Sequence, residues 1–200
     1  MNPARTHAAA WLVVILSAGL VACGAPNRFL LDLPDSGAVP AGSSDYQRIG
    51  LHQVLLPEYA SSERIASLNA GAAIVQDENN RWAESPADAV ARHLAAGISR
   101  RLAAVVLVEP FPRGLNPELQ IEVRFDRFVR DLPRGNAALG GQFVLISGDG
   151  RTVRHIEGFS FANPLPGDDY AGYVAGLNEG LSELAAAISR AALTLSDAPE

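Results

Sequence analysis

The residue types that most often do chemistry in proteins are sparse and scattered in this chain of 200 residues. Beyond His7, its histidines are His52, His93 and His155, and no two of these three lie within four residues of each other. The chain has no H-x-H or H-E-x-x-H metal motif, no G-x-S-x-G elbow, no P-loop and no G-x-G-x-x-G turn. The sequence therefore predicts no catalytic, metal-binding or cofactor-binding residue and no cofactor, and we expect His52 and His155 on sheet faces and His93 at a surface or boundary.

The best candidate for a pair of acid–base carboxylates is Glu122 and Asp126. They lie four residues apart in an expected strand, so their side chains share one face. Arg124 stands between them, which favours solvated cross-strand pairing over acid–base catalysis. Similarly, Asp168 and Asp169 precede an expected helix, where carboxylates interact favourably with the N-terminal helix dipole.

One cysteine, Cys23, does have a clear chemical assignment. It follows an apolar run over residues 8–20 with Arg5 upstream, and that run as a helix would span about 20 Å, short of a ~30 Å hydrocarbon core. The run matches the apolar region of a signal peptide and ends in Leu20-Val21-Ala22-Cys23, which resembles a bacterial lipobox. We therefore predict a signal peptide over residues 1–22 and lipid attachment at Cys23, acylated on its sulfur and then on its amino group. The alternative is a secreted protein with a free or buried thiol.

Three acyl chains on one residue hold a protein at a membrane, because each buried CH₂ contributes about 0.8 kcal/mol. The chain is thus expected to be anchored to a membrane without spanning it. In lipoproteins of this type an Asp after the cysteine commonly retains the protein in the inner membrane. Gly24 therefore favours the periplasmic face of the outer membrane.

Composition excludes several classes of protein. The chain is 48% hydrophobic and 19% charged, which is ordinary for a globular protein and unlike a disordered one. It has 16 basic and 22 acidic residues, a formal charge of −6 and no basic run, so we expect no nucleic-acid partner. A single cysteine also excludes an internal disulfide.

Hydrophobic periodicity predicts an α+β fold in one domain over residues 28–200, after a tether at 23–27. A strong helix is expected at 85–102, with Ser85 as N-cap and an apolar residue at every fourth position. A second helix at 169–195 carries glycines at 172, 176 and 180, which favours close packing on the sheet, with a self-association face as the alternative. Strands are expected at residues 28–33, 48–56, 65–68, 72–76, 81–83, 105–108, 119–126, 143–146 and 153–161.

Three features of these strands are specific enough to be tested. Residues 77–80 are expected to form a polar turn between two strands, and 105–108, a continuous β-branched run, a buried central strand. Gly148-Asp149-Gly150 predicts a hairpin. The result is an antiparallel or mixed β-sheet packed against two main helices.

The aromatic residues are few, and Tyr59 and Trp82 stand out among them. We favour core or edge packing for both and leave contact with a partner protein as the alternative.

A set of motifs in a fixed order resembles a known family. These are the lipobox at Cys23, Leu55-Leu56-Pro57-Glu58-Tyr59, Arg81-Trp82-Ala83-Glu84-Ser85-Pro86, and the strand from Gln120 to Phe128 with its hairpin and closing helix. In that order the chain resembles the ABC-type transport auxiliary lipoproteins, the PqiC-like proteins of Gram-negative bacteria, over nearly its whole mature length.

The resemblance implies a non-enzymatic outer-membrane component of an MCE-type system. In such systems an inner-membrane ABC transporter works with an MCE-family protein that crosses the periplasm, and the cargo is phospholipid or another hydrophobic molecule. The expected partners are that MCE protein, through it the ABC transporter, and outer-membrane lipid through the acyl anchor. Self-association is left open, as are two other functions: a carrier lipoprotein that binds lipid in its own pocket, and a lipoprotein hydrolase.

Overall fold

The computed structural model describes residues 25–31 and 44–196, so the predicted signal peptide and the first two residues of the predicted tether, Cys23 and Gly24, lie outside the described residues. The elements follow in the order β1 (Asn27–Phe29), β2 (Arg48–Leu51), the short 3₁₀ helix η1 (Glu58–Ala60), β3 (Arg64–Leu68), β4 (Ile74–Trp82), α1 (Pro86–Leu102), β5 (Val105–Val108), β6 (Leu119–Asp131), β7 (Asn136–Ser147), β8 (Val153–Pro164) and α2 (Tyr170–Ser196).

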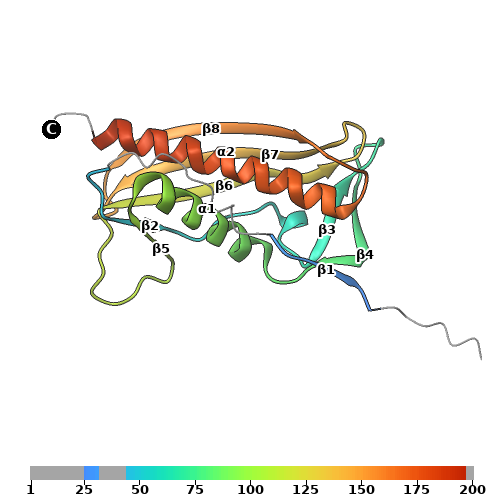
Figure 1. Ribbon diagram of the computed structural model, residues 1–200, viewed down its shortest axis with the longest axis horizontal. Coiled ribbons are helices and arrows are strands. Elements are labelled where there is room, and N and C mark those ends of the chain that lie inside the picture. Colours follow the sequence, from blue (N-terminus) through green and yellow to red (C-terminus); the bar gives the residue numbers. More distant parts are fainter. Residues whose placement is uncertain (1–24, 32–43, 197–200) are drawn as a thin grey trace, which may run out of the picture.

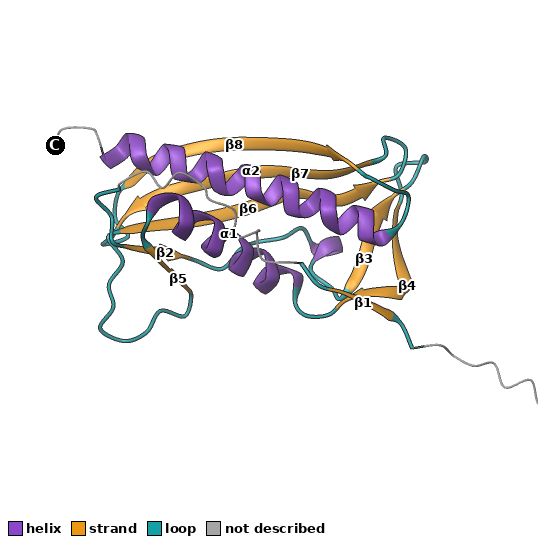
Figure 2. Cartoon of the chain, in the orientation of Figure 1, coloured by secondary structure: helices purple, strands orange, loops and turns teal. Residues whose placement is uncertain are grey.

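Eight strands form one mixed sheet, and both helices lie on one of its faces (Figures 1 and 2). The strands β6, β7 and β8 form an antiparallel meander along the full length of the molecule. On the other side of β6, β2 pairs in parallel with its first residues and carries β5, while β3 pairs with its last residues and carries β4 and β1. The predicted fold class, α+β with a mixed sheet and two main helices, is confirmed.

The core lies between the sheet and the helices, as the periodicity predicts. Alternate residues of β6 point inward and are buried, from Leu119 to Phe125, while Glu122 and Arg124 between them are exposed. On α1 the predicted N-cap is confirmed, because the Ser85 side chain accepts a hydrogen bond from the Asp88 amide. The apolar residues of its stripe are all buried: Val90, Leu94, Ile98 and Leu102.

Glycines bring α2 into direct contact with the sheet. Gly176 lies over Ala137 of β7, and Gly180 lies over Leu139 of β7 and Asn163 of β8. All three helical glycines, with Gly172, are buried. Close packing of the helix on the sheet is therefore the correct interpretation, and these glycines offer no self-association face.

The polar turn predicted at residues 77–80 is wrong, because β4 runs unbroken from Ile74 to Trp82. The pairing of β4 with β3 jumps from Arg64↔Arg81 to Ala66↔Gln76, so the polar residues occupy a bulge within one strand. Asp77 compensates for the lost ladder bonds by accepting hydrogen bonds from the Asn79 amide and the Asn80 side chain.

The central position predicted for residues 105–108 is also wrong. Strand β5 pairs only with β2 and lies at the edge of the sheet, and Val105 is 59% exposed. A β-branched run indicates a strand but carries no information about how many partners it has. The predicted strand at 48–56 is likewise shorter, since regular pairing ends at Leu51 and resumes only as a single bridge from Leu55 to Arg124.

Candidate functional site on the open face of the sheet

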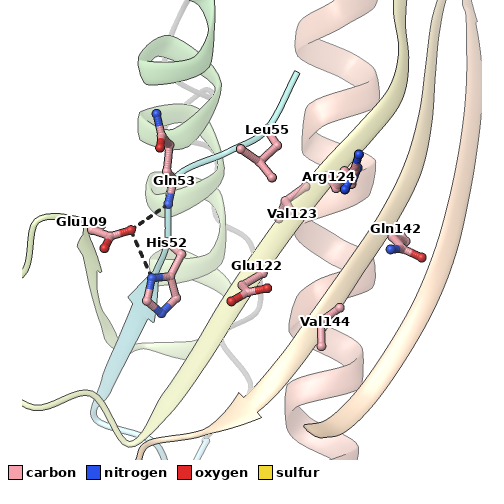
Figure 3. Close-up of a pocket in the computed structure, with 9 residues that line it drawn as sticks. All are labelled: His52, Gln53, Leu55, Glu109, Glu122, Val123, Arg124, Gln142 and Val144. Carbon is pink, nitrogen blue, oxygen red and sulfur yellow. Dashed lines mark hydrogen bonds and ion pairs between the residues drawn. The ribbon is translucent and has the colours of Figure 1, made fainter. Parts of the chain in front are cut away.

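The face of the sheet turned away from the helices has a hollow of about 330 Å³. It lies between the segment that leaves β2 and the strands β6 and β7, with α1 and α2 behind the strands (Figure 3). Its lining residues are His52, Gln53, Leu55, Glu109, Glu122, Val123, Arg124, Gln142 and Val144.

His52 is held at one edge of this hollow by two acceptors. Its Nδ1 lies 3.1 Å from Glu109 Oε2, and its Nε2 lies 2.6 Å from Gln120 Oε1. The Gln120 amide nitrogen donates to the Gly148 carbonyl at 2.7 Å, which fixes Oε1 as the atom that faces the imidazole. Glu109 also accepts from the Gln53 backbone amide.

Because both neighbours are acceptors, both ring nitrogens of His52 must donate, and this arrangement favours the imidazolium. Partial burial opposes the charged form, but the hydrogen bonds to Gln120 and Glu109 outweigh it and raise the pKa of His52. In turn, the hydrogen bond from His52 and the Gln53 amide lower the pKa of Glu109. The contact between His52 and Glu109 therefore links the end of β2 to the end of β5. His52 also contacts Gln120 of β6, which in turn is hydrogen-bonded to the turn between β7 and β8.

The rest of the hollow combines exposed charge with apolar surface. Glu122 and Arg124 project from β6, and Arg124 Nε lies 4.0 Å from Asp126 Oδ1 with both side chains exposed, so this solvated pair lies within one strand and not across strands as expected. Apolar contact area comes from Leu55 and Val144, and Ile156 of β8, 61% exposed, pairs beside Val144. No serine, threonine or cysteine is among the lining residues, so no hydroxyl or thiol nucleophile lines this hollow beside His52.

The two aromatic residues singled out by the sequence lie away from this hollow. Trp82 is only 3% exposed, and its ring packs 6.1 Å from that of Tyr173, so the core-packing interpretation describes it. Tyr59 is partly buried against the core, and its hydroxyl accepts a hydrogen bond from the Phe128 amide at 3.2 Å. Partner contact by either residue stays a prediction.

Of the other positions predicted from the sequence, Asp169 and His155 lie where they are expected and His93 does not. Asp169 caps α2 by accepting from the Gly172 amide at 2.7 Å, as expected for a carboxylate before a helix. His155 lies on β8 within 3.0 Å of Glu157. The boundary position expected for His93 is wrong, because this residue is buried between α1 and α2, with Nε2 3.4 Å from Ser182 Oγ.

The cluster of His52, Glu109 and Gln120 was not found from the sequence. Leu51 and Val108 pair in register as the last residues of two parallel strands, so the residues that follow them meet at one edge of the sheet. Recognising that β2 and β5 are parallel neighbours would have placed His52 beside Glu109.

Two features are absent from residues 25–31 and 44–196. No helix there is long and apolar enough to cross a membrane. Within the same ranges, no three His, Cys, Asp or Glu side chains come together as a set of metal ligands.

Comparison with known proteins identifies the family of this chain. The family model described as "ABC-type transport auxiliary lipoprotein component" matches residues 29–189. The chain matches no curated protein sequence.

Two solved structures share the fold. The crystal structure of a protein described as uncharacterized is 20% identical, with a TM-score of 0.68 over 84% of this chain and 98% of that one. Protein XCC0632 from Xanthomonas campestris is 18% identical, with a TM-score of 0.60 over 86% of this chain and 95% of that one. At these identities the two structures support the fold alone.

Proposed function

Because the chain belongs to the family of ABC-type transport auxiliary lipoprotein components, we propose that it is the outer-membrane subunit of an MCE-type ABC transport system. In this role it is anchored through Cys23 at the periplasmic face and docks an MCE-family protein that spans the periplasm. Transport of lipids or other hydrophobic molecules between the two membranes by that system contributes to the integrity of the envelope. The chain itself performs no catalysis, and the ATP is used by the inner-membrane transporter.

The position of β1 supports an anchored orientation. Asn27, the first residue of β1, follows Cys23 by four positions, and four extended residues reach at most about 14 Å. In Figure 1 β1 lies at the right-hand end of the long axis, with β3, β4 and the start of α2. An acylated Cys23 therefore holds this end at the membrane and directs the opposite end, with the turn between β7 and β8, into the periplasm.

The contact between α2 and the sheet favours a docking role over a lipid-carrier role. A carrier needs a lipid-sized apolar cavity, for which the space between helix and sheet is the natural place. Here the backbone of α2 at Gly180 lies directly on Leu139, and the core between them is filled. The hydrolase alternative has even less support, since no hydroxyl or thiol nucleophile lines the open-face hollow.

The open face of the sheet is the surface that suits an MCE partner. It presents apolar area at Leu55, Val144 and Ile156 beside the charges of Glu122 and Arg124, the combination of contact area and orienting charge found at protein interfaces.

Site-specific crosslinking in intact cells tests this function. A photoreactive residue at Ile156 should give an adduct with an MCE subunit, whereas the same residue at Ala175, exposed on α2, should not. An adduct from both positions, or from neither, would count against docking on the open face. Lipid that copurifies with the protein in a fixed ratio, without any MCE adduct, would favour the carrier.

A further inference from the structure

A second hollow, of about 420 Å³, lies at the other end of the molecule, beside the strands that gather around β1. Residues from β3, β4, the end of β6 and the start of α2 line it, all from the right-hand end of Figure 1. They are Ser67, Val75, Gln76, Asp77, Glu78, Asn79, Arg130, Leu132 and Tyr170.

Arg130 is the unusual residue of this hollow, because it is a buried cation without a counter-ion. It is 7% exposed, and no Asp or Glu oxygen of the described chain lies within 4.0 Å of its nitrogens. Its Nη2 donates to the backbone carbonyl of Asp168, and its guanidinium carbon lies 4.8 Å above the Tyr170 ring. Its Nε has no hydrogen-bond partner among the described residues.

A second polar group in the same hollow is at most weakly partnered. Ser67, which pairs in register with Arg130, is 5% exposed, and its Oγ interacts weakly with the Tyr170 hydroxyl but has no hydrogen-bond partner within 3.5 Å among the described residues. Burying an unpaired charge or hydroxyl is costly, so native proteins seldom leave one without a ligand or water to complete it. A guanidinium beside a hydroxyl donor is the pairing that recognises phosphate oxygens.

The rim of the hollow has the opposite charge and an apolar part. Glu78 is exposed, and beside it the Asp77 carboxylate, which accepts from the Tyr170 hydroxyl at 2.7 Å and from Asn79 and Asn80, adds a second negative charge. Val75 and Leu132 are among the large hydrophobic residues exposed on the surface. The hollow thus presents a cation at its base, carboxylates at its rim and apolar side chains at its mouth.

We propose that this hollow binds the phosphoethanolamine headgroup of a membrane phospholipid. The phosphate oxygens accept from Arg130 and Ser67, and the ammonium donates to Glu78 and is attracted by the negative charge of Asp77. Val75 and Leu132 contact the glycerol and the first acyl carbons, while the chains stay in the bilayer. A singly anionic headgroup would bind more weakly, because it offers nothing to the two carboxylates.

The inference that this headgroup belongs to a bilayer lipid rests on the proposed function, in which the protein is anchored at a membrane. Asn27 pairs with Asn80, and the Asn80 side chain donates to Asp77 of the hollow, so the site adjoins the segment that leads to Cys23. A headgroup held there would fix the tilt of the anchored domain on the membrane. The recognition chemistry itself does not depend on the anchor.

The test uses the full acylated protein in phosphatidylcholine nanodiscs and a soluble probe, glycerophosphoethanolamine. Binding is followed by the NMR signal of the Arg130 Nε–H, which should move on titration. Glycerophosphoethanolamine should bind at least about tenfold more tightly than glycerophosphoglycerol or inorganic phosphate. Equal binding of inorganic phosphate would overturn the headgroup assignment, and an unchanged Nε–H signal would overturn the site.

The lipid arm replaces part of the phosphatidylcholine with phosphatidylethanolamine. This should move the same signal and compete with the soluble probe, and the absence of competition would overturn the bilayer as the source. Since the probe is soluble, binding of glycerophosphoethanolamine with no MCE crosslink would leave the site standing and reject the proposed function.

Variants give the second line of the test. Glu78→Gln should weaken glycerophosphoethanolamine about two- to fivefold without weakening inorganic phosphate, which loses a repelling carboxylate, whereas Glu179→Gln on an exposed turn of α2 should change neither. Arg130→Gln should weaken every phosphate probe about tenfold or more. If Arg130→Gln does not fold, Ser67→Ala, expected to lose about threefold, replaces it. Wild-type affinity in Glu78→Gln and Ser67→Ala together would overturn the proposal.

Discussion

Gly180 of α2 packs on Leu139 of β7 so closely that a Cβ at position 180 would lie 2.3 Å from Leu139 Cδ1 and 2.8 Å from Asn163 Oδ1. The absence of one side chain therefore sets the distance between helix and sheet. That distance is also what removes the space for a cargo between them.

Gly180→Ala is expected to destabilise the protein by about 1–3 kcal/mol, because overpacking against a buried leucine exceeds the gain in helix propensity of about 1 kcal/mol. Thermal and urea denaturation measure it. Ala175→Gly, on an exposed face of the same helix, isolates the propensity effect and should cost about 1 kcal/mol. A Gly180→Ala protein as stable as the wild type would show that helix and sheet can separate at no cost.

The pair formed by His52 and Glu109 predicts a pH dependence. A raised pKa means that folded His52 binds its proton more tightly than the unfolded chain, so the stabilisation is complete below the unfolded pKa of about 6.5. It is lost as the pH rises through the folded value. His52→Gln should therefore destabilise the protein more at about pH 5.5 than at about pH 8.5.

NMR titration of the His52 imidazole checks the cause of this effect. Glu109→Gln should lower the pKa of His52, because it replaces a carboxylate acceptor with a neutral group. The His155 signal, on β8, should be unaffected by this substitution. An unchanged pKa of His52 in Glu109→Gln would mean that the ion pair does not hold the imidazolium.

Asp131, at the end of β6, contacts both Arg127 of the same strand and Arg134 of the turn that leads to β7. Its side chain is fully buried and lies 2.5 Å from Arg127 and 2.8 Å from Arg134. Asp131→Ala should cost about 1–3 kcal/mol in unfolding free energy, since the hydrogen bonds to both guanidinium groups are lost. Asp126→Ala, an exposed carboxylate on the same strand, should cost less than about 0.5 kcal/mol. Equal losses in the two variants would contradict a special role for Asp131.

The proposed anchor predicts what happens when Cys23 is replaced. Mass spectrometry of the wild-type protein should find residues 1–22 removed and three acyl chains on Cys23, and Cys23→Ser should abolish envelope sedimentation. Gly24→Asp should keep the acyl chains but shift the protein from outer-membrane to inner-membrane fractions. An unmodified thiol in the wild-type protein, or Cys23→Ser that still sediments with the envelope, would reject the anchor.

Local patterns were sufficient for much of the fold. The helix from Pro86 was predicted from its Ser85 cap and its fourfold apolar spacing, both properties of neighbouring residues. The alternation along β6 predicted that strand and its inward face, and Gly148-Asp149-Gly150 predicted the hairpin between β7 and β8, for the same reason. Residues 77–80 misled because a bulge and a turn use the same polar residue types.

The sequence by itself determined the class of fold and the inward face of each main element, because these depend on residues close together along the chain, and it alone carries the prediction of an acyl anchor at Cys23. Only the tertiary structure decided which strands are parallel neighbours, and that pairing brings His52 to Glu109 and leaves β5 at an edge. It also decided that Arg130 is buried beside Ser67 without a carboxylate partner. Contacts of this kind join residues far apart in the chain. Their contribution to the free energy of folding depends on how completely the folded structure excludes water from them.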